Sequence, residues 1–539
     1  MTLLVEKSPQ ALPLGAACIA SAIKNSSLTK DFCDVSLLSA TVEDDDFRKA
    51  VRISSEAAAE LLAGKIEQQA QGEFEKRICC FSVFVWNRVV LELAAGILQN
   101  KGWICIAGGP EVTAHPEVFT AFDYVVSGEG EIKVPRIIAG VLGVESEGGS
   151  GCETVGVSPD LNSLASPYLD GTIDPAEYGG ALWELARGCP FKCSYCYESK
   201  GEKTVRLFPM ERISKELDLF ARKKVPQVFV LDPTYNANKQ RAIELLNMMA
   251  KKTPDTFYYF EARAEFIDRQ MAKAFTKLPC AVQIGLQSAD ENVLRLVRRP
   301  FNRKQFVRNI GLLNEEGVIF GFDLIYGLPG DTFRSFKDSI DFAIGLYPNN
   351  LEIFCLSVLP GTDIFDRAQE LKLTYDSNPP YHVIHTDKFS QEELKNCDKI
   401  AKACSFFYND GRAVPWFNTI LHALKMKASQ FFVRFAQETE KNPKLKAVVY
   451  SDMACSHSEI ELQQLEFVKK LFSEKNLNRL FPAAHDVIVF NGAISRKTDT
   501  GKSEKIQLNY PVEYIDSEYS FDLDFFAKNV KMKSNWQSI

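Results

Sequence analysis

Ten residues near the middle of the chain, Gly188-Cys-Pro-Phe-Lys-Cys-Ser-Tyr-Cys-Tyr197, decide how the rest of the sequence is interpreted. They contain three cysteines, Cys189, Cys193 and Cys196, in a C-x3-C-x2-C spacing directly after the mostly apolar run 181–186. Thiolates this close in sequence can bind one inorganic centre, and soft sulfur ligands favour an iron–sulfur cluster or zinc. A closed zinc site needs four ligands, whereas a [4Fe–4S] cluster held by three cysteines leaves one iron open.

A zinc site or chance clustering could also account for the three cysteines. A zinc site would need a fourth ligand, yet the only Cys or His between His115 and the motif is Cys152, and the next after Tyr197 is Cys280. The chain has 14 cysteines, but many of the others are scattered singly, as buried cysteines that act as small hydrophobes usually are. The spacing therefore favours a cluster with an open iron.

The motif, with the aromatic Tyr195 directly before its third cysteine, resembles the signature of the radical SAM superfamily. The resemblance implies that Cys189, Cys193 and Cys196 hold a [4Fe–4S] cluster. It also implies that the open iron binds the amino and carboxylate groups of S-adenosylmethionine, with Tyr195 packed near the adenine. The implied fold is a partial barrel of six β/α units, with its chemistry at the carboxyl ends of the strands.

Composition limits the classes of protein that fit. The 539 residues, 46% apolar and 25% charged, are typical of a globular protein with two to four domains. A net charge of −7 argues against a nucleic-acid partner. No apolar run reaches membrane-spanning length, and no signal peptide begins the chain, so we expect no membrane partner. Many cysteines without a secretion signal indicate a reducing, cytoplasmic location.

The first block of the chain, residues 1–145, alternates strand-like and helix-like segments. This alternation predicts a Rossmann-like parallel sheet, with any ligand at the carboxyl ends of its strands. Predicted strands include 35–40 and 78–86, and glycine-rich turns follow two others, at 108–110 and 127–131. Glycine lets a backbone approach a ligand closely, although a plain tight turn explains the same pattern.

Three phrases of this block, LPLGAACIAS, IAGGPEVTAHP and DYVVSGEGE, resemble in order the cobalamin-binding domain of cobalamin-type radical SAM proteins. The family's Asp-x-His-x-x-Gly turn is replaced by Lys7-Ser-Pro-Gln10, and no histidine precedes His115. We therefore expect bound cobalamin without a protein histidine on cobalt. The cobalamin contacts implied by the resemblance are Ser8, Trp86, Gly108, Gly109, Glu111, Ser127, Gly128, Glu129 and Gly130.

The rest of the α/β chain divides into three predicted parts. Residues 146–178, rich in Gly, Ser, Asp and Pro, read as a linker. Residues 179–374 are the predicted radical SAM partial barrel, and residues 375–539 a small, mainly helical cap or substrate domain, in which 487–490 looks strand-like. Six strands are expected in the barrel, at 182–186, 227–231, 257–261, 282–285, 319–324 and 351–357.

Polar residues stand at the ends of several barrel strands. Glu261 ends YYFE, Gln287 lies in QIGLQS and Asp323 in DLIYGLPGD, while Arg299 is placed on the helix after Gln287, next to Arg298. A ribose needs hydrogen-bonding carboxylates or amides, and a ligand carboxylate needs a guanidinium group. The set resembles oxygen-independent coproporphyrinogen oxidase and its relatives, in which the matching residues contact S-adenosylmethionine.

The second barrel strand departs from that pattern. The family's Gly-Gly-Glu is replaced by Leu231-Asp-Pro-Thr-Tyr-Asn236, where Asp232 is the expected substitute in the S-adenosylmethionine site. Backbone carbonyls of this turn could serve the methionine amino group as well.

Together the resemblances imply a cobalamin-dependent radical SAM enzyme that generates a 5′-deoxyadenosyl radical. Its commonest reaction is methyl transfer to an unactivated carbon, here of a small molecule or peptide, with flavodoxin or ferredoxin as one-electron reductant. Two alternatives stay open. One is a radical SAM cyclase, mutase or dehydrogenase whose first domain delivers no methyl group. The other is a non-catalytic iron–sulfur or corrinoid-binding protein, which would not need the nucleoside-contacting residues.

Overall fold

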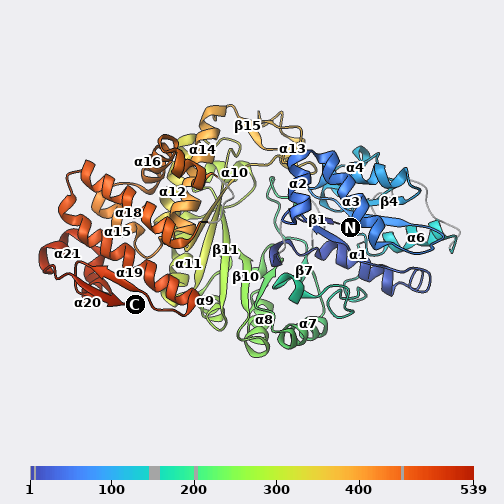
Figure 1. Cartoon of the computed structure of the whole chain (residues 1–539), viewed down its shortest axis with the longest axis horizontal. Coiled ribbons are helices and arrows are strands. Elements are labelled where there is room, and N and C mark those ends of the chain that lie inside the picture. Colours follow the sequence, from blue (N-terminus) through green and yellow to red (C-terminus); the bar gives the residue numbers. More distant parts are fainter. Residues whose placement is uncertain (1, 5–7, 145–157, 200–203, 451–454) are drawn as a thin grey trace.

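The computed structural model describes residues 2–4, 8–144, 158–199, 204–450 and 455–539. A central parallel sheet is flanked on one side by the N-terminal α/β region and on the other by a helical C-terminal region (Figure 1). Residues 145–157, most of which belong to the predicted linker, lie outside the described residues. Among the described helices, none combines the length and apolar character needed to cross a bilayer.

The N-terminal region contains two small parallel sheets. β1 (Thr2–Leu4) pairs with β2 (Ser39–Thr41), and the other sheet has the order β3-β4-β5, with β3 (Ile78–Ser82), β4 (Ile104–Gly108) and β5 (Tyr124–Val125). Its helices are α1 (Leu14–Asn25), α2 (Asp45–Ile53), α3 (Ser55–Gln69), α4 (Arg88–Gln99), α5 (Pro110–Ala114) and α6 (Lys133–Leu142). The single sheet predicted from the alternation is therefore divided in two.

The predicted strand 78–86 is too long. β3 ends at Ser82, because Asn87 turns the chain into α4: its side chain accepts from the Phe84 N–H at 2.8 Å and donates to the Ser82 carbonyl at 3.2 Å. β3 lies at the edge of its three-stranded sheet, so Trp86 follows an edge strand and not a central one.

The central sheet has six parallel strands in the order β13-β12-β11-β10-β9-β6. Their bounds are β6 (Ala181–Trp183), β9 (Gln227–Val230), β10 (Phe257–Ala262), β11 (Cys280–Gln287), β12 (Ile319–Tyr326) and β13 (Asn350–Cys355). The helices between them are α7 (Met210–Lys223), α8 (Lys239–Lys252), α9 (Arg269–Phe275), α10 (Glu291–Leu296), α11 (Arg303–Glu316) and α12 (Phe333–Ile344). The parallel α/β fold is confirmed.

The two faces of the central sheet differ. In β11 the side chains of Val282, Ile284 and Leu286 are fully buried, whereas Gln283 and Gly285 on the opposite face are only half-buried. A parallel sheet covered on both faces would read as a continuous apolar run. One face therefore packs under the helices, and the other, called here the inner face, stays accessible and carries polar side chains.

The C-terminal region is mainly helical. After α13 (Asp363–Asp366) and the hairpin of β14 (Thr374–Tyr375) and β15 (Val383–His385), α14 (Gln391–Cys404) runs into a π-helix at 405–410. The later elements are α15 (Phe417–Leu424), α16 (Ala428–Lys441), α17 (Pro443–Val449), α18 (His457–Glu474), α19 (Phe481–Thr500), β16 (Lys505–Leu508), α20 (Val512–Ile515), α21 (Leu523–Asn529) and β17 (Asn535–Ser538).

Two short strands, β7 (Ala186–Arg187) and β8 (Arg206–Leu207), pair beside the cysteine loop.

The strand expected around Val487–Phe490 is wrong. These residues lie inside α19 and are buried, so the apolar run has no polar face to reveal a helical period. Periodicity cannot separate a buried helix from a buried strand. The C-terminal region packs around aromatic rings such as Phe407, which contacts Phe417, Phe431 and Phe435 among others.

Candidate functional site

The segment that leads into the cysteine loop is fixed by Asp232. One of its carboxylate oxygens accepts from the backbone N–H groups of Leu185 at 2.8 Å and Ala186 at 3.0 Å. Burial raises the pKa of Asp232 to about 7 against the opposing effect of these two hydrogen bonds. Asp232, expected to contact S-adenosylmethionine, therefore has one oxygen committed to holding the backbone ahead of the loop.

The cysteine loop itself is held from two sides. The Ser194 N–H donates to the Val297 carbonyl at 3.0 Å, and the Ser194 carbonyl accepts from the Ile364 N–H at 2.9 Å. Within the loop, the Cys196 N–H donates to the Cys193 carbonyl at 3.1 Å. Backbone hydrogen bonds thus set the shape of the loop that carries the three thiols.

The three thiols fit a cluster better than a single ion. No three His, Cys, Asp or Glu side chains of the described residues converge closely enough for one metal ion. In a [4Fe–4S] cluster each cysteine binds a different iron, so the sulfur atoms stay apart. Burial, with smaller contributions from Cys193 and Cys189, raises the pKa of the Cys196 thiol to about 11. Binding of iron must therefore displace the thiol proton.

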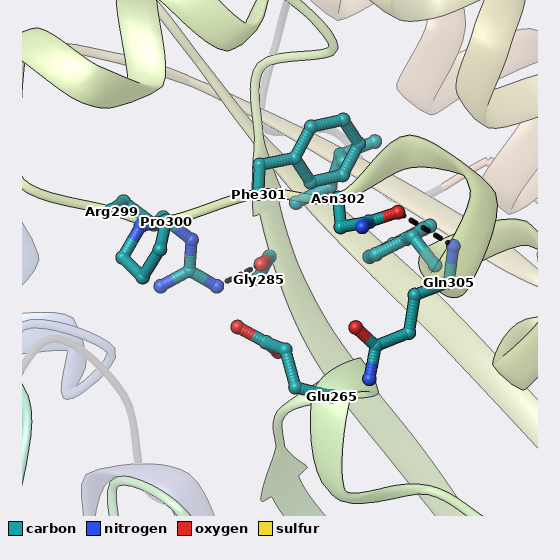
Figure 2. A pocket seen from close by; sticks show the side chains of 9 residues that line it. Glu265, Gly285, Arg299, Pro300, Phe301, Asn302 and Gln305 are labelled. Carbon is teal, nitrogen blue, oxygen red and sulfur yellow. Dashed lines mark hydrogen bonds between the residues drawn. The ribbon is translucent and has the colours of Figure 1, made fainter.

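Arg299 extends its guanidinium group into the cysteine loop. One Nη atom lies 3.8 Å from the Cys193 Sγ and 3.4 Å from the Tyr195 hydroxyl, and the other donates to the Gly285 carbonyl (Figure 2). The sequence suggested that Arg299 lies on the helix after Gln287. In the structure it follows the end of that helix, α10, by three residues. Its neighbour Arg298 turns away and pairs with Asp363 at 3.0 Å. Of the two adjacent arginines, Arg299 faces the cysteines.

Gln287 combines two features that mark a ligand-binding position. Its φ of 67° is in the left-handed region, and the pairing between β11 and β12 shifts register there. Its Oε1 atom is buried without a hydrogen-bond partner among the described residues. A Cβ atom on Gly285 would overlap the Gln287 amide and come within 3.1 Å of Arg299, so glycine makes room for both side chains. Backbone strain and an unpaired acceptor cluster at functional sites.

A row of polar side chains crosses the inner face of the sheet. Glu261, Gln283, Asp323 and Glu352 come from adjacent strands, and the Gln283 amide donates to Asp323 at 2.7 Å. A Cβ on Gly321 would overlap the Gln283 side chain, so this glycine is required there. The sequence did not indicate Gln283, because only the strand register shows that it stands beside Glu261.

Two of the three carboxyl groups in this row, those of Glu261 and Asp323, have raised pKa values. Glu261 is accessible to solvent, but partial burial, reinforced by the charge of Asp323, raises its pKa to about 8. Burial raises the pKa of Asp323 to about 6. Glu261 is therefore largely neutral at pH 7, when it can both donate to and accept from a ligand hydroxyl group.

A small cavity lies beside Arg299. Glu265, Arg299 and Gln305 point into it (Figure 2), and it adjoins a larger cavity of about 410 Å³ that shares Glu265 and Gln305. Arg263, buried at the end of β10, pairs with Glu265 and lies over the Phe191 ring at 3.8 Å. The end of β10 thus contacts the cysteine loop through Arg263 and Phe191, which the sequence did not indicate.

The glycines expected to contact cobalamin fall into two groups. A Cβ on Gly109 would come 2.6 Å from the Val83 carbonyl oxygen, and one on Gly130 would come 2.8 Å from Ile19, so internal packing requires both glycines. A Cβ on Gly108 would approach nothing closer than 3.8 Å. Gly128 has a φ of 80° and similar free space. Only Gly108 and Gly128 leave room for a ligand.

Two acidic residues expected at cobalamin are engaged elsewhere. Glu111 is buried, accepts from the Tyr381 hydroxyl and lies 3.4 Å from Arg88. Glu129 pairs with Arg187 at 3.0 Å and with Arg206. The two carboxylates therefore tie the N-terminal region to the C-terminal region and to the cysteine loop, and their oxygens are committed to these contacts.

The other expected cobalamin residues, Ser8, Trp86 and Ser127, are half-buried or exposed. Trp86 is 57% exposed and stacks on Phe84 with 4.5 Å between ring centres. Ser8 is half-buried, and Ser127 lies at the loop that follows β5, with its hydroxyl 3.5 Å from the Thr113 carbonyl. Arg187, directly before the cysteine loop, pairs with both Glu129 and Glu131. The glycine-rich turn 127–131 therefore faces the cysteine loop.

The ion-pair network of Arg187 gives a stability prediction. Its guanidinium group, 13% exposed, pairs with Glu129, Glu131 and Glu184. Arg187→Met removes the partner of Glu131 and Glu184, while Glu129 keeps Arg206, and should lower the free energy of unfolding by about 3–5 kcal/mol in urea titrations. Lys215→Met, which removes an exposed pair with Glu211, should cost at most about 0.5 kcal/mol. Equal effects would show that the network does not hold the regions together.

Glu261 gives a prediction about pH. In the folded protein its pKa is about 8, above its ordinary value of 4.5, so between these values the folded state keeps a proton that the unfolded state releases. Rising pH through this window therefore lowers the stability of the wild type. Glu261→Gln has no proton to lose, so its melting temperature should gain on that of the wild type between pH 6 and pH 9. A gap that is constant with pH would contradict the raised pKa.

Comparisons with known proteins agree with this geometry. A family model described as the radical SAM superfamily matches residues 183–343, and one described as a protein of unknown function (DUF4080) matches residues 369–449. The chain is 28% identical over 350 residues to the cobalamin-dependent radical SAM methyltransferase TokK of Streptomyces tokunonensis, covering 56% of this chain and 50% of TokK.

A second relative is the 2-(S-pantetheinyl)-carbapenam-3-carboxylate methyltransferase of Streptantibioticus cattleyicolor, 26% identical over 68% of this chain and 62% of the relative. The chain thus spans only about half to three-fifths of the length of these two curated relatives. Its fold is similar to that of OxsB, a cobalamin-dependent S-adenosylmethionine radical enzyme solved with aqua-cobalamin bound, with a TM-score of 0.52, 15% identity and coverage of 98% of this chain and 84% of OxsB. Residues 183–343 therefore match the radical SAM superfamily, and the chain as a whole is similar to cobalamin-dependent radical SAM methyltransferases.

Proposed function

We propose that this chain is a cobalamin-dependent radical SAM methyltransferase that acts on a carbon atom of a small molecule or peptide. One observation carries the proposal: the predicted cobalamin-binding edge of the N-terminal region lies against the predicted cluster-binding loop. Arg187 joins the glycine-rich loop edge of the N-terminal region to the first residues of the cysteine loop. A corrinoid held at Gly108 and Gly128 would therefore lie beside a cluster held at Cys189, Cys193 and Cys196.

The residues present fit the implied cofactors. The three thiols, the buried unpaired Oε1 of Gln287 and the free space at Gly108 are what a cluster, S-adenosylmethionine and cobalamin respectively would use. When bound, these groups supply reductive cleavage of S-adenosylmethionine and a transferable methyl group. The protein's part is to bind them in register and to orient the substrate.

Each site residue has a distinct part in this mechanism. Arg299, half-buried beside the cysteines, offers a guanidinium group to the carboxylate of S-adenosylmethionine. Gln287 accepts a hydrogen bond from the ligand, and Tyr195 packs beside it, its hydroxyl 3.4 Å from Arg299. Glu261 and Asp323, with their raised pKa values, exchange hydrogen bonds with the ribose hydroxyl groups.

The cluster prediction is tested by the triple variant in which Cys189, Cys193 and Cys196 are changed to Ala. The protein should keep its fold, because the loop is held by backbone hydrogen bonds, and should lose iron and all formation of 5′-deoxyadenosine. Iron content, circular dichroism and chromatography of the nucleoside measure the three outcomes. A four-iron cluster that still assembles in the variant would refute the proposal.

Adjacent arginines provide a matched test of the S-adenosylmethionine site. Arg299→Ala should weaken binding by roughly 1.5–3 kcal/mol, because a charge-assisted hydrogen bond is lost. Arg298→Ala removes only an exposed pair with Asp363 and should leave the affinity unchanged. Isothermal titration of both reconstituted variants measures this difference, and equal affinities would place the carboxylate elsewhere.

Gly108→Val tests the corrinoid site. The Cβ of the new side chain meets only ordinary contacts, so the melting temperature should stay near the wild-type value, while retention of hydroxocobalamin in equilibrium dialysis should be lost. Retention equal to that of the wild type would show that Gly108 does not contact the corrinoid. No retention by the wild type itself would leave a radical SAM enzyme without methyl delivery by this region, such as a cyclase, mutase or dehydrogenase.

A further inference from the structure

The stretch 292–314 is strongly basic in an acidic protein. It contains six basic residues and no acidic one, although the chain as a whole has a net charge of −7. The six are Arg295, Arg298, Arg299, Arg303, Lys304 and Arg308. The stretch comprises most of α10, the connecting segment and most of α11. If this positive charge served the fold, the basic side chains should form ion pairs within the chain.

Folding explains little of this charge. Within the described part of the chain, Arg295, Arg303, Lys304 and Arg308 form no ion pair, whereas the exposed Arg269 on the neighbouring helix α9 pairs with Glu315 at 2.6 Å. Arg303 and Lys304 occupy the first turn of α11, where the positive end of the helix dipole disfavours cations. Arg303 packs its guanidinium group over the Phe342 ring, but its charge stays uncompensated.

The basic stretch directly abuts the cysteine loop. The Val297 carbonyl accepts from the Ser194 N–H at 3.0 Å, and Arg299 lies 3.8 Å from the Cys193 Sγ. Lys192, inside the cysteine loop, is exposed and adds a further positive charge. A short path of one hydrogen bond and a few covalent bonds therefore connects this surface to the cysteine thiols.

Exposed apolar side chains accompany the charges. Leu296 is 45% exposed and Val307 is 40% exposed. Transient electron-transfer complexes bury a small area and depend on charge complementarity for fast association. A basic rim with a few apolar contacts beside a redox centre has this character.

We propose that the surface formed by Lys192, Arg295, Arg298, Arg303, Lys304 and Arg308, called here the basic surface, docks an acidic one-electron carrier protein of the flavodoxin type. The proposal rests on the proposed function, because the electron is destined for the cluster at the cysteine loop. The anionic flavin hydroquinone of the carrier loses one electron and becomes the neutral semiquinone. The oxidised cluster gains that electron, and no proton moves.

RNA is the competing occupant of a basic surface, and the structure favours the protein carrier. A protein that binds the phosphate backbone of RNA uses a long track of basic side chains. Here acidic residues border the surface, with Asp363 paired to Arg298, and Asp268 and Arg308 lining the same 410 Å³ cavity. The position against the cysteine loop is useful for electron transfer and has no bearing on holding RNA.

The test compares two charge-reversed double variants of the reconstituted full chain. Lys304→Glu/Arg308→Glu changes the basic surface, and Arg222→Glu/Lys251→Glu makes the same change in charge on α7 and α8, at the lower edge of Figure 1. Stopped-flow absorbance follows reduction of the cluster by flavodoxin hydroquinone or by dithionite, and binding of oxidised flavodoxin is titrated by its flavin fluorescence.

At about 10 mM salt, where charges are felt over about 30 Å, reduction by flavodoxin should be at least about tenfold slower in Lys304→Glu/Arg308→Glu than in the wild type. Flavodoxin binding should weaken in parallel. The difference should vanish near 1 M salt, where the screening length is about 3 Å. The α7–α8 variant should stay within about twofold of the wild type. Dithionite needs no docking, so its rate should be the same in all three proteins.

Equal flavodoxin rates and affinities in the two double variants would overturn the proposal. Retention of tRNA that is lost only in Lys304→Glu/Arg308→Glu, without any effect on flavodoxin, would assign the surface to RNA and overturn it as well. A wild-type cluster that dithionite cannot reduce, or reduction without 5′-deoxyadenosine, would instead contradict the proposed function. The flavodoxin titration judges the surface in that case too.

Discussion

The candidate site depends on one half-buried cation, Arg299. Arg299 is enclosed between the end of β11 and the cysteine loop, and its guanidinium group contacts the Gly285 carbonyl, the Tyr195 hydroxyl and the Cys193 sulfur. A buried guanidinium group is costly unless donors find acceptors and its charge finds a partner. Arg299 is partly shielded from solvent and contacts the Tyr195 phenol and the Cys193 thiol. Its positive charge can therefore stabilise an anionic sulfur or a ligand carboxylate beside it.

The sheet supplies the geometry around this cation. Glycine at 285 and at 321 clears the inner face, so that Gln287 and Gln283 can lie across positions where other side chains would stand. The carboxyl groups of Glu261 and Asp323 then share a partly desolvated recess, which raises the pKa of both. The polar row is therefore a consequence of strand register, with each member one strand away from the next.

The central sheet and the cysteine motif could be predicted from the sequence. The partners of Glu111 and Glu129 could not, for a physical reason. The strands of the central sheet are visible because largely apolar runs extend over the lengths of β10 to β12, and the cysteine motif is local. The partners of Glu111 and Glu129 are not local: Tyr381 is 270 residues away and Arg187 is 58 residues away. Nothing in the spacing could show that these carboxylates are engaged in ion pairs and hydrogen bonds between regions.

The central claim is that this site cleaves S-adenosylmethionine and passes on a methyl group. The most direct measurement incubates the reduced, cobalamin-loaded protein with S-adenosylmethionine carrying a deuterated methyl group and analyses the products by mass spectrometry. The account predicts 5′-deoxyadenosine together with S-adenosylhomocysteine and deuterated methyl label on the corrinoid. Intact S-adenosylmethionine, with neither nucleoside formed and no label on the corrinoid, would contradict it.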